Sequence, residues 1–347
     1  MARRMLEESL RAAKGITLGE PLKEFTAVEV LKDVKLDPHY GGIFSLQYNF
    51  DGSHLVAGFS GGGIRMYKGR TGELVRELRP NRHGGFAIMC LRFHPKDPTM
   101  LYAGSAEGHV YLIHTETGAL THIVTEPSNQ INAMDFCVDG YYFCTSGKDL
   151  AVRSYSTKTG KLDKTYGGIG SSAGGGGSDT ELEAGNTMRV YALKFHPDNE
   201  NIFITAGWDN HIKIWDLRTN DGIKRQIHGP HVCGDALDIK GQNILSGSWC
   251  ANRALQEWDY GEGKLVRDIK FPHTNGAFLY CAEYGDLGTV LAGGSGTNSV
   301  EVIEAETNKV IGSVPMTKPV QAMDSALGGR LFATGGGDNL LRLSAMI

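Results

Sequence analysis

A chain of 347 residues in which 41% are hydrophobic and 21% are charged has enough apolar material for a packed core, which excludes a disordered protein. The formal net charge of -4 gives no whole-protein attraction for polyanions, so we expect neither nucleic acid nor a membrane as a partner. The 47 glycines against 11 prolines predict many tight turns.

The first 19 residues are predicted to form a short helical extension. Leu6, Leu10 and Ala13 fall on one helical stripe, and Gly15 can end the helix. The segment has two adjacent glutamates and no apolar core stretch, so it does not read as a secretory signal. We expect this helix to lie on the domain at 20–347, with presentation to a partner as the alternative.

From residue 43 onward one sequence unit recurs. Its clearest copy, at 189–227, has four apolar runs separated by turn residues such as His196-Pro197-Asp198 and Asp209-Asn210. A period of about 40 residues with four such runs predicts four short antiparallel strands per unit. Seven units follow one another, near residues 43–79, 86–124, 130–166, 189–227, 231–270, 276–314 and 319–347.

The repeat is interrupted once, at 167–187. This stretch is rich in glycine and serine and has little apolar surface to bury, so we predict a flexible loop. A phosphate-binding loop is disfavoured because no Lys-Ser/Thr pair follows and the next element is a strand.

The seventh unit ends at Ile347, directly after its third strand. Residues 25–31 (Phe-Thr-Ala-Val-Glu-Val-Leu) are rich in β-forming residues and precede the first unit. We therefore predict that a strand within 25–36 supplies the missing outer strand and joins both ends of the domain.

Two units carry a recognisable pair of motifs. Ala-Gly-Trp-Asp at 206–209 precedes Ile-Trp-Asp at 214–216, and Ser-Gly-Ser-Trp at 246–249 precedes Trp-Asp at 258–259. On these motifs, repeated in register, residues 25–347 resemble the WD-repeat (WD40-type) family. The resemblance implies an all-β fold with a single seven-bladed β-propeller of four-stranded antiparallel blades, closed by the N-terminal strand. It also implies a role in holding other proteins.

Within the fourth unit, Thr205, Asp209 and Trp215 are placed for a buried hydrogen-bond network, which we interpret as structural. Other units lack the aspartate, so we expect them to depend more on packing. Those positions hold Ser60, Glu107, Cys250 and Gly296.

No set of residues indicates catalysis, a metal or a cofactor, so we predict a non-catalytic protein without cofactors. His228 and His231 flank Gly-Pro, which is not a helical ligand spacing. The six cysteines include no CxxC pair, which favours a reducing intracellular compartment. We expect the cytoplasm, with the nucleus or a cytoskeletal or ciliary setting left open.

A propeller brings the first residues of its innermost strands and the turns between its second and third strands to one face. Large aromatics and arginine on that face are the residue types that dominate binding energy at protein interfaces. The predicted partner-binding residues are Phe44, Phe59, Lys148, Arg189, Tyr191, Trp208, Asp235, Trp249, Phe278 and Tyr280.

Three functions fit these residues, each with other proteins as partners and with no small-molecule substrate. The first is a scaffold, monomeric itself, within a multiprotein assembly. The second is a substrate receptor of a cullin-type ubiquitin ligase, because residues 205–218 resemble the box of such receptors, in which Asp216 and Arg218 would contact the ligase adaptor. The third is a reader of peptides or modified tails, suggested by Asp235 beside Tyr191 and Trp208.

Overall fold

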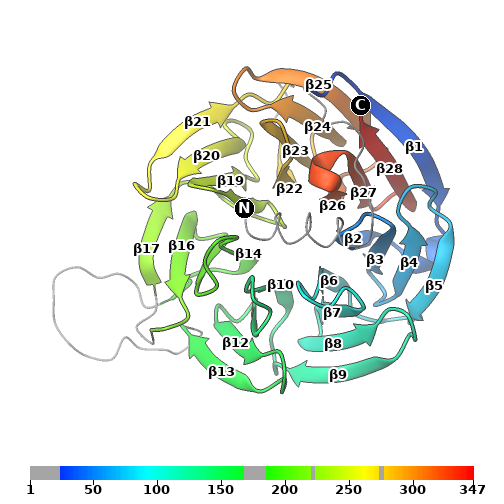
Figure 1. Cartoon of the computed structure of the whole chain (residues 1–347), viewed down its shortest axis with the longest axis vertical. Helices are drawn as coiled ribbons and strands as arrows, with labels where there is room; N and C mark the ends of the chain where they lie inside the picture. The colour runs from blue at the N-terminus through cyan, green and yellow to red at the C-terminus, as the bar shows by residue number, and fades with distance from the viewer. Residues whose placement is uncertain (1–23, 168–184, 220–222, 273–276) are drawn as a thin grey trace.

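The computed structural model describes residues 24–167, 185–219, 223–272 and 277–347. In these ranges the chain forms 28 strands and two short 3-10 helices, and the strands build seven four-stranded antiparallel sheets. The sheets stand as blades around a central channel (Figure 1). The predicted all-β, seven-bladed propeller is confirmed. The helix expected at 1–19 lies outside the described residues, as does nearly all of the loop expected at 167–187.

The first four blades follow the chain from its innermost to its outermost strand. Blade 1 contains β2 (Ile43–Tyr48), β3 (His54–Phe59), β4 (Ile64–Lys68) and β5 (Leu74–Arg79). Blade 2 contains β6 (Ile88–Phe93), β7 (Met100–Ser105), β8 (His109–His114) and β9 (Leu120–Thr125). Blade 3 contains β10 (Ile131–Phe136), β11 (Tyr142–Gly147), β12 (Val152–Ser156) and β13 (Leu162–Tyr166). Blade 4 contains β14 (Val190–Phe195), β15 (Ile202–Gly207), β16 (His211–Asp216) and β17 (Ile223–His228).

The last three blades complete the ring. Blade 5 contains β18 (Leu237–Lys240), β19 (Asn243–Gly247), β20 (Leu255–Asp259) and β21 (Leu265–Ile269). Blade 6 contains β22 (Leu279–Tyr284), β23 (Thr289–Gly294), β24 (Ser299–Glu304) and β25 (Lys309–Pro315). Blade 7 contains β26 (Val320–Ala326), β27 (Leu331–Gly336), β28 (Leu340–Met346) and, as its outer strand, β1 (Val28–Lys35).

Strand β1 closes the ring as the sequence predicted. It pairs antiparallel with β28, from Val28 opposite Met346 to Lys35 opposite Leu340, and the two strands lie side by side in Figure 1. The backbone N–H of Thr26 extends the contact to the Ile347 carbonyl oxygen at 2.7 Å. The strand starts three residues later than the β-rich run at 25–31, and Phe25 is instead buried in the core. Both ends of the described chain are therefore held in one blade.

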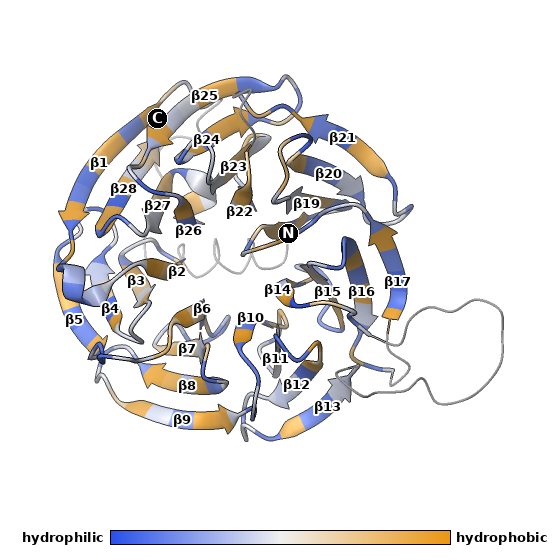
Figure 2. Ribbon diagram, turned by 180° about the vertical axis from the view of Figure 1, so that it is seen from behind, coloured by the Kyte–Doolittle hydropathy of each residue, from blue (hydrophilic) through white to orange (hydrophobic). Residues whose placement is uncertain are grey.

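Packing between neighbouring blades forms the core. Trp215 of blade 4 is fully buried, stacks on Phe203 with ring centroids 6.0 Å apart, and meets Tyr166 of blade 3 at 5.8 Å. The innermost strands are largely buried, whereas outer strands such as β9 are mostly exposed. The outer strands accordingly mix hydrophilic and hydrophobic residues in Figure 2. Burying each large apolar side chain contributes about 1.5–3 kcal/mol, so the blades depend on one another for stability.

Carboxylates of the innermost strands tie blades together next to the channel. Asp135 accepts a hydrogen bond from the backbone N–H of Phe195 at 2.8 Å, and Asp238 accepts one from Tyr284 at 2.9 Å. Asp324 accepts one from Tyr48 at 2.6 Å, which joins the seventh blade to the first. Aspartates at equivalent positions therefore link blades 3 to 4, 5 to 6 and 7 to 1.

The propeller has two unlike faces. We call the upper face the one formed by the starts of the innermost strands and by the turns between the second and third strands of each blade. The connections between blades also run along the upper face, and the lower face carries the turns between the first and second strands and between the third and fourth strands. None of the described helices has the length and apolar character needed to cross a bilayer.

Deleting residues 24–36 should destabilise the whole propeller, because β28 would lose its partner and expose a row of unpaired backbone groups. We expect the midpoint of thermal unfolding to fall by roughly 10 °C or more, since each kcal/mol shifts a large domain by about 2–4 °C. Circular dichroism measures the midpoint. Glu29→Ala is the control, because this exposed residue of β1 should tolerate the change. An unchanged midpoint in the deletion variant would contradict closure by β1.

Candidate functional site

An aromatic cluster lies on the upper face where blades 4 and 5 meet. Trp208 lies in the turn after β15, and its ring centroid is 5.3 Å from that of Tyr191. The ring of His231 lies nearly parallel to that of Trp208, with centroids 6.4 Å apart. The Arg189 guanidinium lies 5.6 Å from the centre of the Trp208 ring, within cation–π range. The indole N–H of Trp208 donates to Cys233 Sγ at 3.1 Å. Because this donor is satisfied, the half-buried ring is held in place.

A second cluster continues the first toward blade 6. Trp249, in the turn after β19, is 42% exposed, and its ring centroid lies 4.9 Å from that of Phe278. Its indole N–H donates to the Tyr280 hydroxyl at 3.0 Å. We call Tyr191, Trp208, Trp249, Phe278 and Tyr280 together the aromatic patch. Five of the predicted face residues thus lie in neighbouring clusters on blades 4 to 6, with Arg189 against Trp208.

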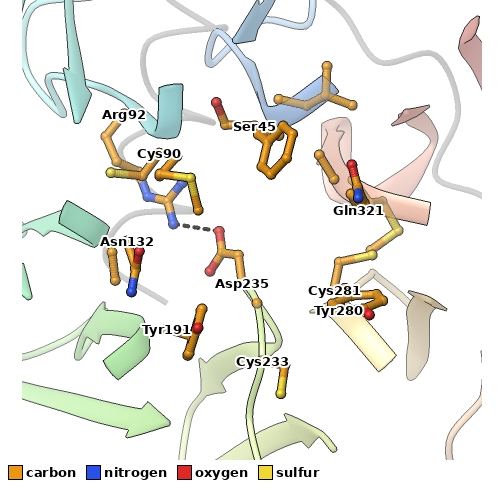
Figure 3. A pocket seen from close by; sticks show the side chains of 17 residues that line it. Ser45, Cys90, Arg92, Asn132, Tyr191, Cys233, Asp235, Tyr280, Cys281 and Gln321 are labelled. Carbon is orange, nitrogen blue, oxygen red and sulfur yellow. Dashed lines mark hydrogen bonds and ion pairs between the residues drawn. The ribbon is translucent and has the colours of Figure 1, made fainter. Parts of the chain in front are cut away.

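The aromatic patch borders a cavity at the upper mouth of the channel (Figure 3). Phe44, Tyr191 and Tyr280 are among the residues that line this space of about 290 Å³. Its other walls are largely apolar and rich in sulfur, with Met89 and Cys281 as examples. A cavity of this size and character suits one inserted side chain better than a large ligand.

Arg92 and Asp235 form an ion pair across the cavity, drawn as the dashed line in Figure 3. The Arg92 Nη2 atom lies 2.7 Å from Asp235 Oδ2, and Lys194 Nζ lies 3.6 Å from Asp235 Oδ1. Arg92 is buried, and its Nε also lies 3.4 Å from Asp135 Oδ1. Burial opposes ionisation of Asp235, but the charges of Arg92 and Lys194 prevail and lower its pKa to about 2.

The two cations neutralise Asp235, which weakens the basis for the predicted tail reader. That hypothesis needs an acidic pocket for a positively charged side chain, whereas the Asp235 carboxylate already has two cationic partners. Its side chain is 43% exposed because it lies in the channel rather than in packed core. The structure therefore provides a polar floor without unpaired negative charge at Asp235.

The other predicted face residues divide into two that reach the surface and one that does not. Phe44 lines the cavity, and Lys148 is exposed in the turn of blade 3. Phe59 is fully buried, so its prediction as an exposed residue was wrong. Tyr40, on the short 3-10 helix η1 (Pro38–Tyr40), lies 5.0 Å from its ring. Aligning the repeats could not reveal this cover, because the helix belongs to a connection between blades.

The hydrogen-bond network predicted in blade 4 is present only in part. Trp215 Nε1 donates to Thr205 Oγ1 at 2.9 Å, as expected. Asp209 instead pairs with Lys213 at 2.5 Å, and both side chains are almost completely buried. A similar pair joins Arg153 and Asp149 in blade 3. The sequence signal that would have found these pairs is a cation four residues after the turn aspartate.

Asp216 and Arg218 pair with each other. The Arg218 guanidinium contacts both carboxylate oxygens of Asp216, at 2.7 Å and 3.0 Å for the shortest contact to each. This hydrogen bond lowers the pKa of Asp216. The arrangement gives the Trp-Asp-Leu-Arg segment a structural explanation within the turn, and contact with a ligase adaptor stays a prediction.

The cysteines and the other potential metal ligands form no recognisable reactive site within the described residues. All six cysteines are free. Across the residues that the structure describes, no three histidine, cysteine, aspartate or glutamate side chains lie together in an arrangement that could hold a metal ion. The buried thiols of Cys90 and Cys281 have raised pKa values because burial disfavours the thiolate, so neither is an activated nucleophile.

Comparison with known proteins identifies the repeats. The family model "WD domain, G-beta repeat" matches residues 32–68 and 180–216. An uncharacterised WD repeat-containing protein of Schizosaccharomyces pombe is 24% identical over 63% of the chain and 55% of its own length. Protein tipD of Dictyostelium discoideum is 22% identical over 73% of the chain and 45% of its own length.

A third relative is matched over a larger share of its own length. The guanine nucleotide-binding protein subunit beta of Oryza sativa is 19% identical over 70% of the chain and 65% of its own length. The chain spans about half the length of the first two relatives. The similarity therefore concerns the propeller and not the whole of those proteins.

Lys213→Ala should destabilise the protein by about 3–5 kcal/mol, because it leaves the buried Asp209 carboxylate without its cation. Urea unfolding followed by circular dichroism measures the change. Lys264→Ala is the matched control, since Lys264 and its partner Glu262 are both exposed and water screens their pair, and its unfolding midpoint should match that of the parent protein. Equal midpoints for the two variants would show that the buried pair adds no stability.

The Arg92–Asp235 pair should make stability depend on pH in the acid range. The pKa of Asp235 is held at about 2, whereas an aspartate in an unfolded chain has a pKa of about 3.9. The stabilisation is therefore complete above about pH 4 and is lost as the pH falls toward 2. Asp235→Asn should be less stable by about 1–3 kcal/mol at pH 7, and this difference should shrink at pH 3. Urea unfolding at pH 7, 5 and 3 tests this, and a constant difference would refute it.

Proposed function

We propose that this chain, which is a WD-repeat β-propeller protein, acts as a non-catalytic scaffold that holds other proteins against its upper face. The observation that carries the proposal is the aromatic patch. Its two tryptophans keep part of their surface open while their N–H groups are satisfied internally. Rigid aromatic anchors beside an arginine are the composition of binding hot spots.

The position of the patch supports the proposal further. Its residues come from blades 4 to 6, so the ring places side chains that are far apart in sequence on one surface. Turns carried by a rigid scaffold are well suited to recognition, because the fold fixes where they lie. The matched family model describes a structural repeat rather than a set of catalytic residues. A binding role therefore fits this part of the chain better than chemistry.

We propose a place within a multiprotein assembly, in which the chain contributes one propeller. The name of the rice relative describes it as a subunit of a larger protein, which gives a precedent for that arrangement. The cytoplasm is the compartment we propose, because the six free cysteines suit a reducing environment.

Replacing both patch tryptophans should remove specific partners. We expect Trp208→Ala/Trp249→Ala to weaken binding by about tenfold or more, since truncating a hot-spot residue costs about 2 kcal/mol or more. Affinity purification followed by mass spectrometry compares the bound proteins, and circular dichroism verifies that the variant is folded.

Tyr141→Ala is the control for this experiment. Tyr141 is 69% exposed in the turn between β10 and β11, on the lower face. The substitution removes an exposed aromatic side chain on the opposite face from the patch, so the variant should keep all partners. If the double variant is folded and retains the same partners as the parent protein, the upper face is not the binding surface.

A further inference from the structure

Two cations near the aromatic patch have no carboxylate partner among the described residues. Arg189 lies against Trp208, and Lys148 is exposed in the corresponding turn of the neighbouring blade 3. Neither forms an ion pair with a carboxylate in the part of the chain that the structure describes. An incoming anion would therefore meet cations that are not already neutralised.

The carboxylates of the same region are neutralised. Asp149, beside Lys148, pairs with Arg153 at 2.5 Å, and Asp209, beside Trp208, pairs with Lys213 at 2.5 Å. Asp268 of blade 5 is exposed but pairs with Arg253 at 2.9 Å, and the exposed Glu107 lies in the turn of blade 2. Within the described ranges, the unpaired charge around the patch is therefore positive although the chain as a whole carries -4.

The cavity beside the patch suits an uncharged apolar group, whereas the cationic surface around the patch suits an anion. Its one acidic group on the upper side, Asp235, is paired with Arg92 and Lys194, so a charged side chain would lose its hydration without gaining an unpaired partner. Walls such as Met89 and Cys281 instead offer contacts to an apolar side chain. An uncharged apolar group is the occupant that fits.

One buried oxygen atom at this site accepts no hydrogen bond from the described residues. The side-chain oxygen of Gln321, a residue that lines the cavity, is buried and accepts no hydrogen bond from the described part of the chain. A buried acceptor without a donor is unfavourable, and a backbone N–H of a bound peptide would satisfy it.

We infer that the aromatic patch and the cavity bind an acidic peptide segment that inserts one uncharged apolar side chain into the channel mouth. The flanking carboxylates of the peptide face Arg189 and Lys148, and its aliphatic or aromatic anchor lies between Phe44 and Tyr280. This inference rests on the proposed function and adds the chemistry of the partner to it. A nucleic acid is disfavoured because it has no apolar side chain to fill the cavity.

A random heptapeptide library displayed on phage, selected on the intact protein, tests the inference without a known partner. We expect enriched sequences with aspartate or glutamate on both sides of one Leu, Met or Phe. The most enriched peptide is then synthesised with a fluorophore and titrated by fluorescence anisotropy. Its Kd should rise by about tenfold in Arg189→Glu, and similarly in Lys148→Glu, because each variant puts a like charge against the peptide.

Arg70→Glu is the matched control. This exposed arginine lies on the lower face, in the turn between β4 and β5. Its replacement by glutamate changes the net charge by the same amount as Arg189→Glu. Its Kd for the peptide should stay within about twofold of the parent value, and circular dichroism verifies that each variant folds. Equal losses of affinity in Arg70→Glu and Arg189→Glu would mean that only total charge matters, which overturns the site.

Three other outcomes also overturn the inference. They are enrichment of basic peptides, no enrichment at all, and tighter anisotropy binding of a labelled single-stranded oligonucleotide than of the peptide. The proposed function is tested separately by the tryptophan variant. If that variant loses partners while peptide selection shows no acidic preference, the upper face is the binding surface and only the partner chemistry is wrong.

Discussion

The pairing of β1 with β28 is the contact on which the ring depends. A set of blades in a circle leaves two open edges unless the last sheet receives a strand from the other end of the chain. The bidentate contact of Arg342 with Asp33, at 2.7 Å and 2.8 Å, secures this pairing on the outer side. Asp324, which accepts a hydrogen bond from the backbone of Tyr48, joins the completed blade 7 to blade 1 beside the channel. One contact therefore holds the closing strand in its blade, and the other holds that blade to its neighbour.

The closed ring in turn positions the proposed binding surface. Trp208 and Trp249 lie in turns of separate blades, and their satisfied N–H donors hold their orientation before any partner arrives. Little side-chain freedom would be lost on binding, which favours affinity. The Arg92 and Asp235 pair across the channel joins blade 2 to the loop before blade 5. The ion pair at the cavity therefore forms only when blades 2 and 5 are held at their places in the closed ring.

The architecture could be predicted because its signals are local. Apolar runs and turn residues repeat along the chain, and the missing last strand follows from counting them. Contacts between blades could not be predicted in this way. Phe59 is buried under Tyr40, which lies outside the repeats, and Asp235 is neutralised by Arg92, which lies in a distant repeat. Lys213 was missed for another reason, since a buried lysine at a strand position is unusual unless its partner is known.

The closing strand also has a consequence for folding during synthesis. The Thr26 hydroxyl and the Ile347 carbonyl that it binds are 321 positions apart, so β1 is made long before β28. At roughly 5–20 residues per second, tens of seconds of translation separate the two. Blades 1 to 6 can form an open arc during that time, while blade 7 waits for β28 to leave the ribosome. The nascent chain therefore presents unpaired strand edges to chaperones until β28 has emerged.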